Sequence, residues 1–144
     1  MILYFNKYGR LLECLEYGNA AREGTTNFKI FAYFEGLEDF SRAEIRFKRP
    51  DLEGSELFNL EMTPHTFHYD PQVQSSHYFK SGIDYQGFIF DFNEVFEKDS
   101  EDPQNIEKVI ILDMPGLWGA TITLYNNEQN TTYNVAGSLK FSVE

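Results

Sequence analysis

The chain has 144 residues and a formal net charge of −11, with 23 Asp and Glu residues against 12 Lys and Arg residues. Residues 1–144 most simply form one domain, large enough to bury about two-thirds of the surface of its unfolded chain. A surface this acidic repels phosphate backbones, which argues against nucleic-acid binding. The sequence has no run of about 18 apolar residues to cross a membrane, and its first residues lack the features of a secretory signal.

Aromatic residues make up 17% of the chain, chiefly 14 Phe and 9 Tyr. Such residues are typical of the half-buried surfaces of β-sheets. The single cysteine, Cys14, cannot form an internal disulfide, so the fold must be held by its core. This fits synthesis in a reducing cytoplasm.

The first segments read as a hairpin followed by a strand. Apolar runs at Ile2–Phe5 and Arg10–Tyr17 are separated by Asn6 and Gly9, which can turn the chain. In Phe28–Phe34 both faces of the predicted strand carry aromatic rings. We therefore expect this strand to be covered on both sides.

The middle of the chain contains the most regular alternation. Residues 43–48 place Ala43, Ile45 and Phe47 on one face and Glu44, Arg46 and Lys48 on the other. After the stop at Pro50, the chain is predicted to return as a strand at Leu57–Met62, which continues after Pro64 at His65–Tyr69. Another strand is predicted at Phe88–Phe92.

The last third begins with an acidic interruption. Nine acids between Asp84 and Asp113 face only two lysines, and Asp102 before a proline resembles a helix start. At most a short helix is therefore predicted, around residues 93–112. The run Met114–Tyr125 then alternates as a central strand, with Trp118, Ala120, Ile122 and Leu124 on its inward face. A polar loop at Asn126–Thr132 leads to a closing strand at Ser138–Glu144.

Short alternating strands with turn signals between them are typical of all-β proteins. No amphipathic helix of 10–15 residues separates the strands, which argues against a parallel sheet. The sequence therefore predicts an antiparallel β-sandwich, immunoglobulin-like or jelly-roll-like, whose strand order it does not reveal.

Histidines and acids suggest a metal site only superficially. His65 and His68 lie close to Asp70 and His77 in the sequence, but residues three apart in a strand point to opposite faces. We expect these histidines to be exposed or hydrogen-bonded and to hold no metal. The acids of Asp99–Asp102 lack the ligand spacing and glycine of a calcium loop, so a solvated loop is predicted.

The sequence offers no catalytic motif. No nucleophile elbow, Walker loop or dinucleotide fingerprint is present, and no pair of acids stands in a recognisable glycosidase motif. Cys14 lies between Glu13 and Glu16, which oppose ionisation, so a half-buried structural thiol is expected. We therefore predict a non-enzymatic protein that needs no cofactor.

Two surface features remain open. Arg46, Lys48 and Arg49 form a basic cluster that is too small for a nucleic-acid footprint. Exposed tyrosines can stack on sugars, which leaves a carbohydrate-binding module as an alternative, although core or rim packing is the commoner use. The candidate tyrosines are Tyr8, Tyr78, Tyr85 and Tyr133.

Three stretches together resemble the N-terminal domain of baseplate upper proteins from phages of Gram-positive bacteria. Ala43–Asp51 is similar to the family's strand that ends in an aromatic residue, a short charged step and Pro-Asp. Pro115–Leu124 is similar to its late strand, entered through a glycine and an aromatic residue. Ala136–Glu144 is similar to its closing strand.

The resemblance implies a structural role in a virion, made in the bacterial cytoplasm. Such a domain anchors a peripheral adhesion device to the baseplate, and its implied partners are the central tail hub, the receptor-binding protein and further copies of itself. No catalytic residue is implied. In longer family members a helical linker follows the closing strand, whereas this sequence stops at Glu144, so it is either a truncated piece or a stand-alone relative. The acidic stretch Asn93–Asp113 is a further departure.

Overall fold

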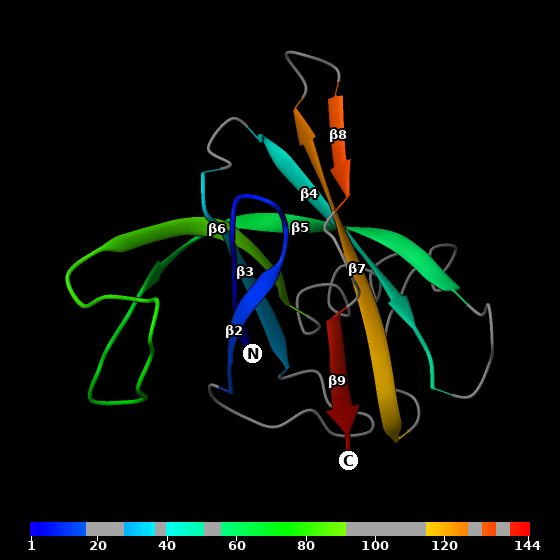
Figure 1. Cartoon of the computed structure of the whole chain (residues 1–144). Helices are drawn as coiled ribbons and strands as arrows, with labels where there is room; N and C mark the ends of the chain where they lie inside the picture. The colour runs from blue at the N-terminus through cyan, green and yellow to red at the C-terminus, as the bar shows by residue number, and fades with distance from the viewer. Residues whose placement is uncertain (17–27, 37–39, 51–55, 92–114, 127–130, 135–138) are drawn as a thin grey trace, which may run out of the picture.

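The computed structural model describes residues 1–16, 28–36, 40–50, 56–91, 115–126, 131–134 and 139–144. Within these residues all regular structure is β-strand (Figure 1). The strands are β1 (Ile2–Phe5), β2 (Leu11–Leu15), β3 (Lys29–Phe34), β4 (Arg42–Lys48), β5 (Glu56–His68), β6 (Asp84–Asp91), β7 (Gly116–Asn126), β8 (Thr131–Asn134) and β9 (Leu139–Val143). The prediction of an all-β sandwich is confirmed, and the helix considered for residues 93–112 lies outside the described residues.

The strands follow the order β2-β1-β3-β6-β5-β4-β7-β8, and β9 pairs with β7. Every pair is antiparallel except β1 with β3, which is parallel. Strand β2 turns back along one side of β1, with Gly9 at a φ of 78° in the hairpin turn. Strand β3 then takes the other side of β1 in the same direction as β1. A parallel pair thus forms without a crossover helix, which the sequence pattern did not predict.

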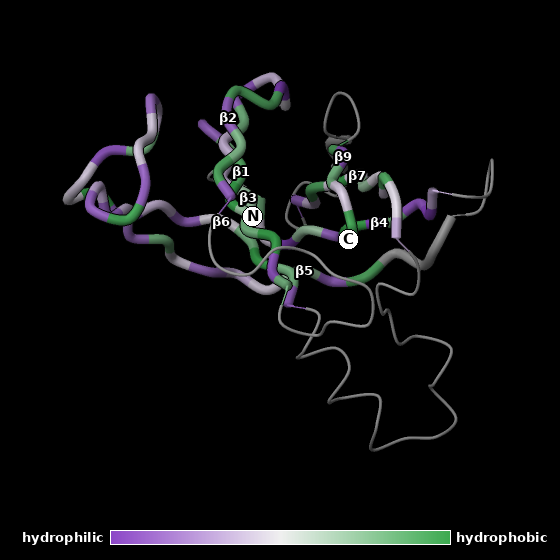
Figure 2. The backbone as a smooth tube through the Cα atoms, turned by 90° about the horizontal axis from the view of Figure 1, so that it is seen from below, coloured by the Kyte–Doolittle hydropathy of each residue, from purple (hydrophilic) through white to green (hydrophobic). Residues whose placement is uncertain are grey.

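Strand β5 joins two sheets into a sandwich. Its first half, as far as Met62, pairs with β4, and its second half, from Thr63, pairs with β6. Sheet A contains β2, β1, β3, β6 and the second half of β5, whereas sheet B contains the first half of β5 with β4, β7, β8 and β9. Figure 2 shows the two groups of strands side by side, with β5 running between them.

The prediction that the strand at Leu57–Met62 continues after Pro64 is confirmed, because Pro64 lies inside β5. Pro64 pairs in register with Phe88 of β6 inside a continuous β5. It sits where the strand changes sheets and, within the described part of the chain, pairs with β6 alone. A proline is tolerated at such an edge because its missing N–H would otherwise point to solvent.

The main core lies between the inward faces of the two sheets. Trp118 of β7 is fully buried, as are Phe47 of β4 and Ile30 of β3. Strand β7 therefore has the central place that its alternation predicted. The other buried members are Met1, Leu3, Phe5, Phe28, Ala32, Phe34, Ala43, Ile45, Met62, Phe88, Phe90, Ala120, Ile122, Leu124, Leu139, Phe141 and Val143.

A second, aromatic core covers the outward face of sheet A. Phe79, in the loop between β5 and β6, is 1% exposed. Five rings lie around it, with centroid distances from 4.9 to 6.4 Å, from Tyr4, Tyr33, Phe67, Tyr69 and Tyr85. The prediction that the strand at Phe28–Phe34 is covered on both sides is confirmed, since this core also holds Phe31.

Strand β8 was not predicted. The polar composition of Asn126–Thr132 indicated a loop, but Thr131 and Thr132 pair with Asn126 and Tyr125 of β7. Strand β9 pairs with Gly116–Ala120 of β7, which leaves the residues after Ala120 on that edge available to another strand. A short polar segment can pair there through its backbone groups alone.

Candidate functional site

A groove of about 590 Å³ opens where strand β6 parts from strand β3. The ladder between these strands runs from Lys29↔Asp91 to Ala32↔Phe88 and then stops. Tyr33 and Phe34 have no partner in β6, and the space beside them is the groove. Its volume lies within the range of ligand pockets, about 300–1,000 Å³.

Gly87 fixes the point of separation. A Cβ atom on this residue would lie 2.2 Å from the carbonyl oxygen of Ala32 and 3.1 Å from the ring of Phe31. Only glycine lets β6 pass this close to the backbone of β3 before the strands diverge. The groove therefore depends on an absent side chain.

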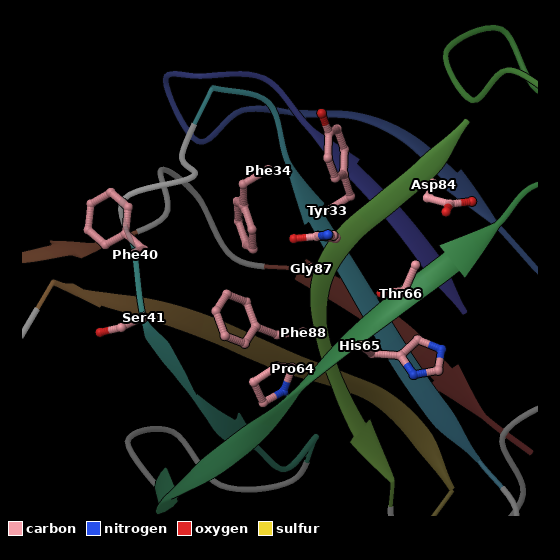
Figure 3. Close-up of a pocket in the computed structure, with 11 residues that line it drawn as sticks. Tyr33, Phe34, Phe40, Ser41, Pro64, His65, Thr66, Asp84, Gly87 and Phe88 are labelled. Atoms are coloured by element: carbon pink, nitrogen blue, oxygen red, sulfur yellow. The ribbon is translucent and has the colours of Figure 1, made fainter. Parts of the chain in front are cut away.

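The two ends of the groove differ in chemistry. Figure 3 shows Phe34, Phe40, Phe88 and Pro64 toward one end and His65, Thr66 and Asp84 toward the other. Phe34 and Phe88 are buried, whereas the polar residues are exposed. The groove thus offers an apolar floor beside a polar rim, an arrangement suited to binding.

The outer edge of β5 runs along this groove and has no neighbouring strand among the described residues. Phe31 and Glu35 donate backbone N–H groups to β1, so Ile30 and Ala32, which alternate with them, face β6. In β6 the backbone groups of Phe88 and Phe90 therefore point to β3, and those of Gly87 and Tyr85 point to β5. The backbone groups of His65 and Phe67, which pair with Gly87 and Tyr85, point to β6 in return. Pro64, Thr66 and His68 then present their backbone groups to the open side.

The histidines do not converge, as the strand geometry predicted. The ring of His65 packs edge-on against an aromatic ring of β3 at 5.6 Å, while Nδ1 of His68 lies 2.6 Å from Oδ1 of Asp84. Asp70 accepts a backbone hydrogen bond within its own turn, and His77 lies in the loop that covers sheet A. Among the described residues no three such side chains gather where a metal ion would fit.

Glu13 of β2 ties the covering loop to sheet A. Its carboxylate accepts hydrogen bonds from the hydroxyl of Ser76 and from the backbone N–H groups of His77 and Tyr78. Partial burial alone would raise the pKa of Glu13, but these hydrogen bonds outweigh it and lower the pKa. The ionised carboxylate therefore stabilises the loop.

Cys14 is more exposed than the half-buried thiol that the sequence predicted. It lies on β2, the outermost strand of sheet A in the described part of the chain. The part of the thiol that is shielded from water, together with the negative charge of Glu16, raises the pKa of Cys14. The opposition to ionisation expected from neighbouring acids is thus present, and the thiol lacks the setting of a reactive cysteine.

The four candidate tyrosines differ in how exposed their side chains are. Tyr8 is 67% exposed and Tyr78 is 40% exposed, whereas Tyr85 is 6% exposed and belongs to the second core. The prediction of an exposed Tyr85 is therefore wrong, because the loop that folds over sheet A buries it. The side chain of Tyr133 lies outside the described part of the chain, as does the acidic run Asp99–Asp102.

Comparison with protein-family models, with curated proteins and with solved structures gave no match for this chain. Within its described residues, no helix is long and apolar enough to span a membrane. The fold and the groove therefore define the class of protein only as an all-β sandwich with an open sheet edge.

The sequence did not predict the groove. Its floor combines rings from three segments, those of Phe34, Phe40 and Phe88, and alternation assigned two of these simply to the core. Gly87 was the available signal, since an isolated glycine inside a strand pattern suggests a close backbone approach. Nothing in one sequence says which backbone approaches.

Proposed function

We propose that this protein is a non-enzymatic structural module, held in a larger assembly by contacts with other proteins. The observation that carries the proposal is the open edge of β5 beside the groove of Figure 3. The edge supplies backbone donors and acceptors, and the groove supplies apolar surface. Proteins that bind an extended segment of a partner as an added strand use this combination.

The assembly we propose is a phage or prophage baseplate, in which the module anchors a peripheral adhesion device. The support is the resemblance of three stretches of the chain to baseplate upper proteins. The described parts of these stretches fall on β4, β7 and β9, which are neighbours in sheet B. The proposed partners are the central tail hub, the receptor-binding protein and further copies of this chain, and the proposed location is the virion.

The first test is the molar mass in solution, measured by light scattering from low concentration to the solubility limit. We expect a mass that rises above that of the monomer as copies associate. A strict monomer at every concentration would contradict self-association through this domain.

A pair of proline variants tests the edge itself. Thr66→Pro removes an N–H that faces the open side, so the fold should keep its stability while association is lost. His65→Pro removes an N–H that faces β6 and should destabilise the fold, which makes it the matched control. If Thr66→Pro associates as the wild type does, the open edge of β5 is not the contact.

A carbohydrate-binding module is the second candidate, and one ring favours it. Tyr78 is 40% exposed and stacks on Tyr4 at a centroid distance of 5.1 Å, so it offers a braced aromatic face. Binding on a glycan array that disappears in Tyr78→Ala would support this candidate. An array without wild-type binding would remove it.

A further inference from the structure

The outward face of sheet B carries a second hollow, of about 450 Å³, where β4, β7 and β9 lie side by side. Four cationic side chains line it, from Arg46, Lys48, Arg49 and Lys140. Three of them form the basic cluster seen in the sequence. Lys140 joins them only through the fold, because β9 pairs with β7.

Gly119 forms the floor of this hollow. It pairs in register with Lys48 on one side and with Lys140 on the other, so the two lysines flank a position without a side chain. A Cβ atom here would meet its nearest neighbours at 3.6 and 3.9 Å, which are ordinary contacts. The glycine is thus not required by crowding, and its effect is to leave room between two cations.

The charge of the hollow contrasts with the rest of the molecule. The other eight Lys and Arg residues of the chain stand against 23 Asp and Glu residues. Farther up the same face, Arg42 is paired with Glu44 and Glu61. Among the described residues, neither Lys48 nor Lys140 has an ion-pair partner, and Glu56, opposite Lys48 in register, lies on the side away from Gly119.

We propose that this hollow binds a compact anion that carries a phosphate or diphosphate group. The positive charges of Lys48 and Lys140 repel each other across Gly119, and an anion between them removes that repulsion. The ammonium groups of Lys48 and Lys140 would act as point charges toward phosphate. A long polyanion is disfavoured because it would extend over the acidic remainder of the surface.

The rim of the hollow indicates that the anion has an apolar part. Leu117 is 53% exposed, and Pro50 packs beside Gly116 at the same side. An organic phosphate with a small apolar substituent can bury this surface, whereas an inorganic phosphate cannot.

The test is a titration of the ¹⁵N-labelled full chain with pyrophosphate, with sodium chloride adjusted to constant ionic strength. We expect saturable shifts of the amide signals of Gly119, Thr121 and Lys140. Titrations with inorganic phosphate and with phenyl phosphate show whether the hollow binds free phosphate or a phosphate attached to an apolar group. Tighter binding of phenyl phosphate supports the apolar rim.

Two variants should weaken or prevent binding of pyrophosphate by different means. Lys140→Gln removes one charge-assisted contact and should weaken binding about tenfold. Gly119→Thr fills the floor with a residue that suits strands and should prevent binding with the charges kept. Circular dichroism and urea unfolding verify that each variant is folded.

Lys29→Gln is the matched control, because Lys29 is a strand cation of sheet A that pairs with Asp91. It should bind pyrophosphate as the wild type does. Shifts that sodium chloride reproduces, or equal loss in Lys29→Gln and Lys140→Gln, would overturn the proposal. Self-association that Lys140→Gln abolishes, without any response to pyrophosphate, would instead make the hollow a protein contact and would also overturn it.

Discussion

The outward faces of the two sheets are built in opposite ways. On sheet A the loop between β5 and β6 folds over the strands and buries Phe79 in a second core. On sheet B the outward face of β4 and β7 carries charged and threonine side chains above a hollow. The cause lies in the strands, because β3 has rings on both faces whereas β4 has them on one. A strand with two apolar faces is stable only when other parts of the chain pack against both faces.

The largest expected effect is the loss of the second core. Phe79→Ala removes the ring that five others surround, and should lower the free energy of unfolding by about 3–5 kcal/mol. Urea denaturation measures this change. Val73→Ala, in the same loop but at a residue that is 59% exposed, should change the free energy little. Similar losses in both variants would mean that the loop does not cover sheet A.

The next effect concerns the close approach of β6 and β3. Gly87→Ala forces a Cβ atom against the carbonyl of Ala32, and the strands must shift at a cost of about 1–3 kcal/mol. The same denaturation experiment measures the cost. Gly119→Ala, whose Cβ atom meets only ordinary contacts on sheet B, should be tolerated. Equal costs in the two variants would contradict the closer backbone approach at Gly87.

The hydrogen bonds between Glu13 and the loop that covers sheet A should make the stability of that loop depend on pH. Because folding lowers the pKa of Glu13 below the ordinary 4.5, its stabilisation is complete above that pH and is lost as the pH falls through the folded-state pKa. The protection factors for hydrogen exchange at the amides of His77 and Tyr78, which compare the observed rate with the intrinsic rate at the same pH, should fall in acid. Glu13→Gln should weaken the tether by about 1 kcal/mol and flatten the pH dependence. Unchanged exchange in the variant would contradict the tether.

The smallest effect is expected on the open face of sheet B. Arg42 lies 4.4 Å from the ring centroid of Tyr125 and pairs with Glu44 and Glu61. These are surface contacts in water, so Arg42→Gln should move the urea midpoint only slightly, and less at high salt. A loss as large as that of Phe79→Ala would mean that this face is covered too.

Much of the fold could be predicted from the alternation of apolar and polar residues, whereas most of the candidate site could not. The inward faces of β4 and β7 were predicted residue by residue, because a period of two depends only on the strand itself. The groove depends instead on where β6 leaves β3, and the hollow depends on Lys140 meeting Lys48 across Gly119. Both are matters of pairing between distant segments.

The sequence by itself determined that this chain forms strands, which side chains face inward, and which strand needs a cover on each side. These follow from local stereochemistry and from the burial of apolar surface. Only the tertiary structure decided that β5 pairs in both sheets, on either side of Pro64, that Tyr85 is buried, and that one edge of the second half of β5 has no partner strand among the described residues. The physical reason is that backbone hydrogen bonds pair any two strands alike, so partners are chosen by the packing of the whole chain.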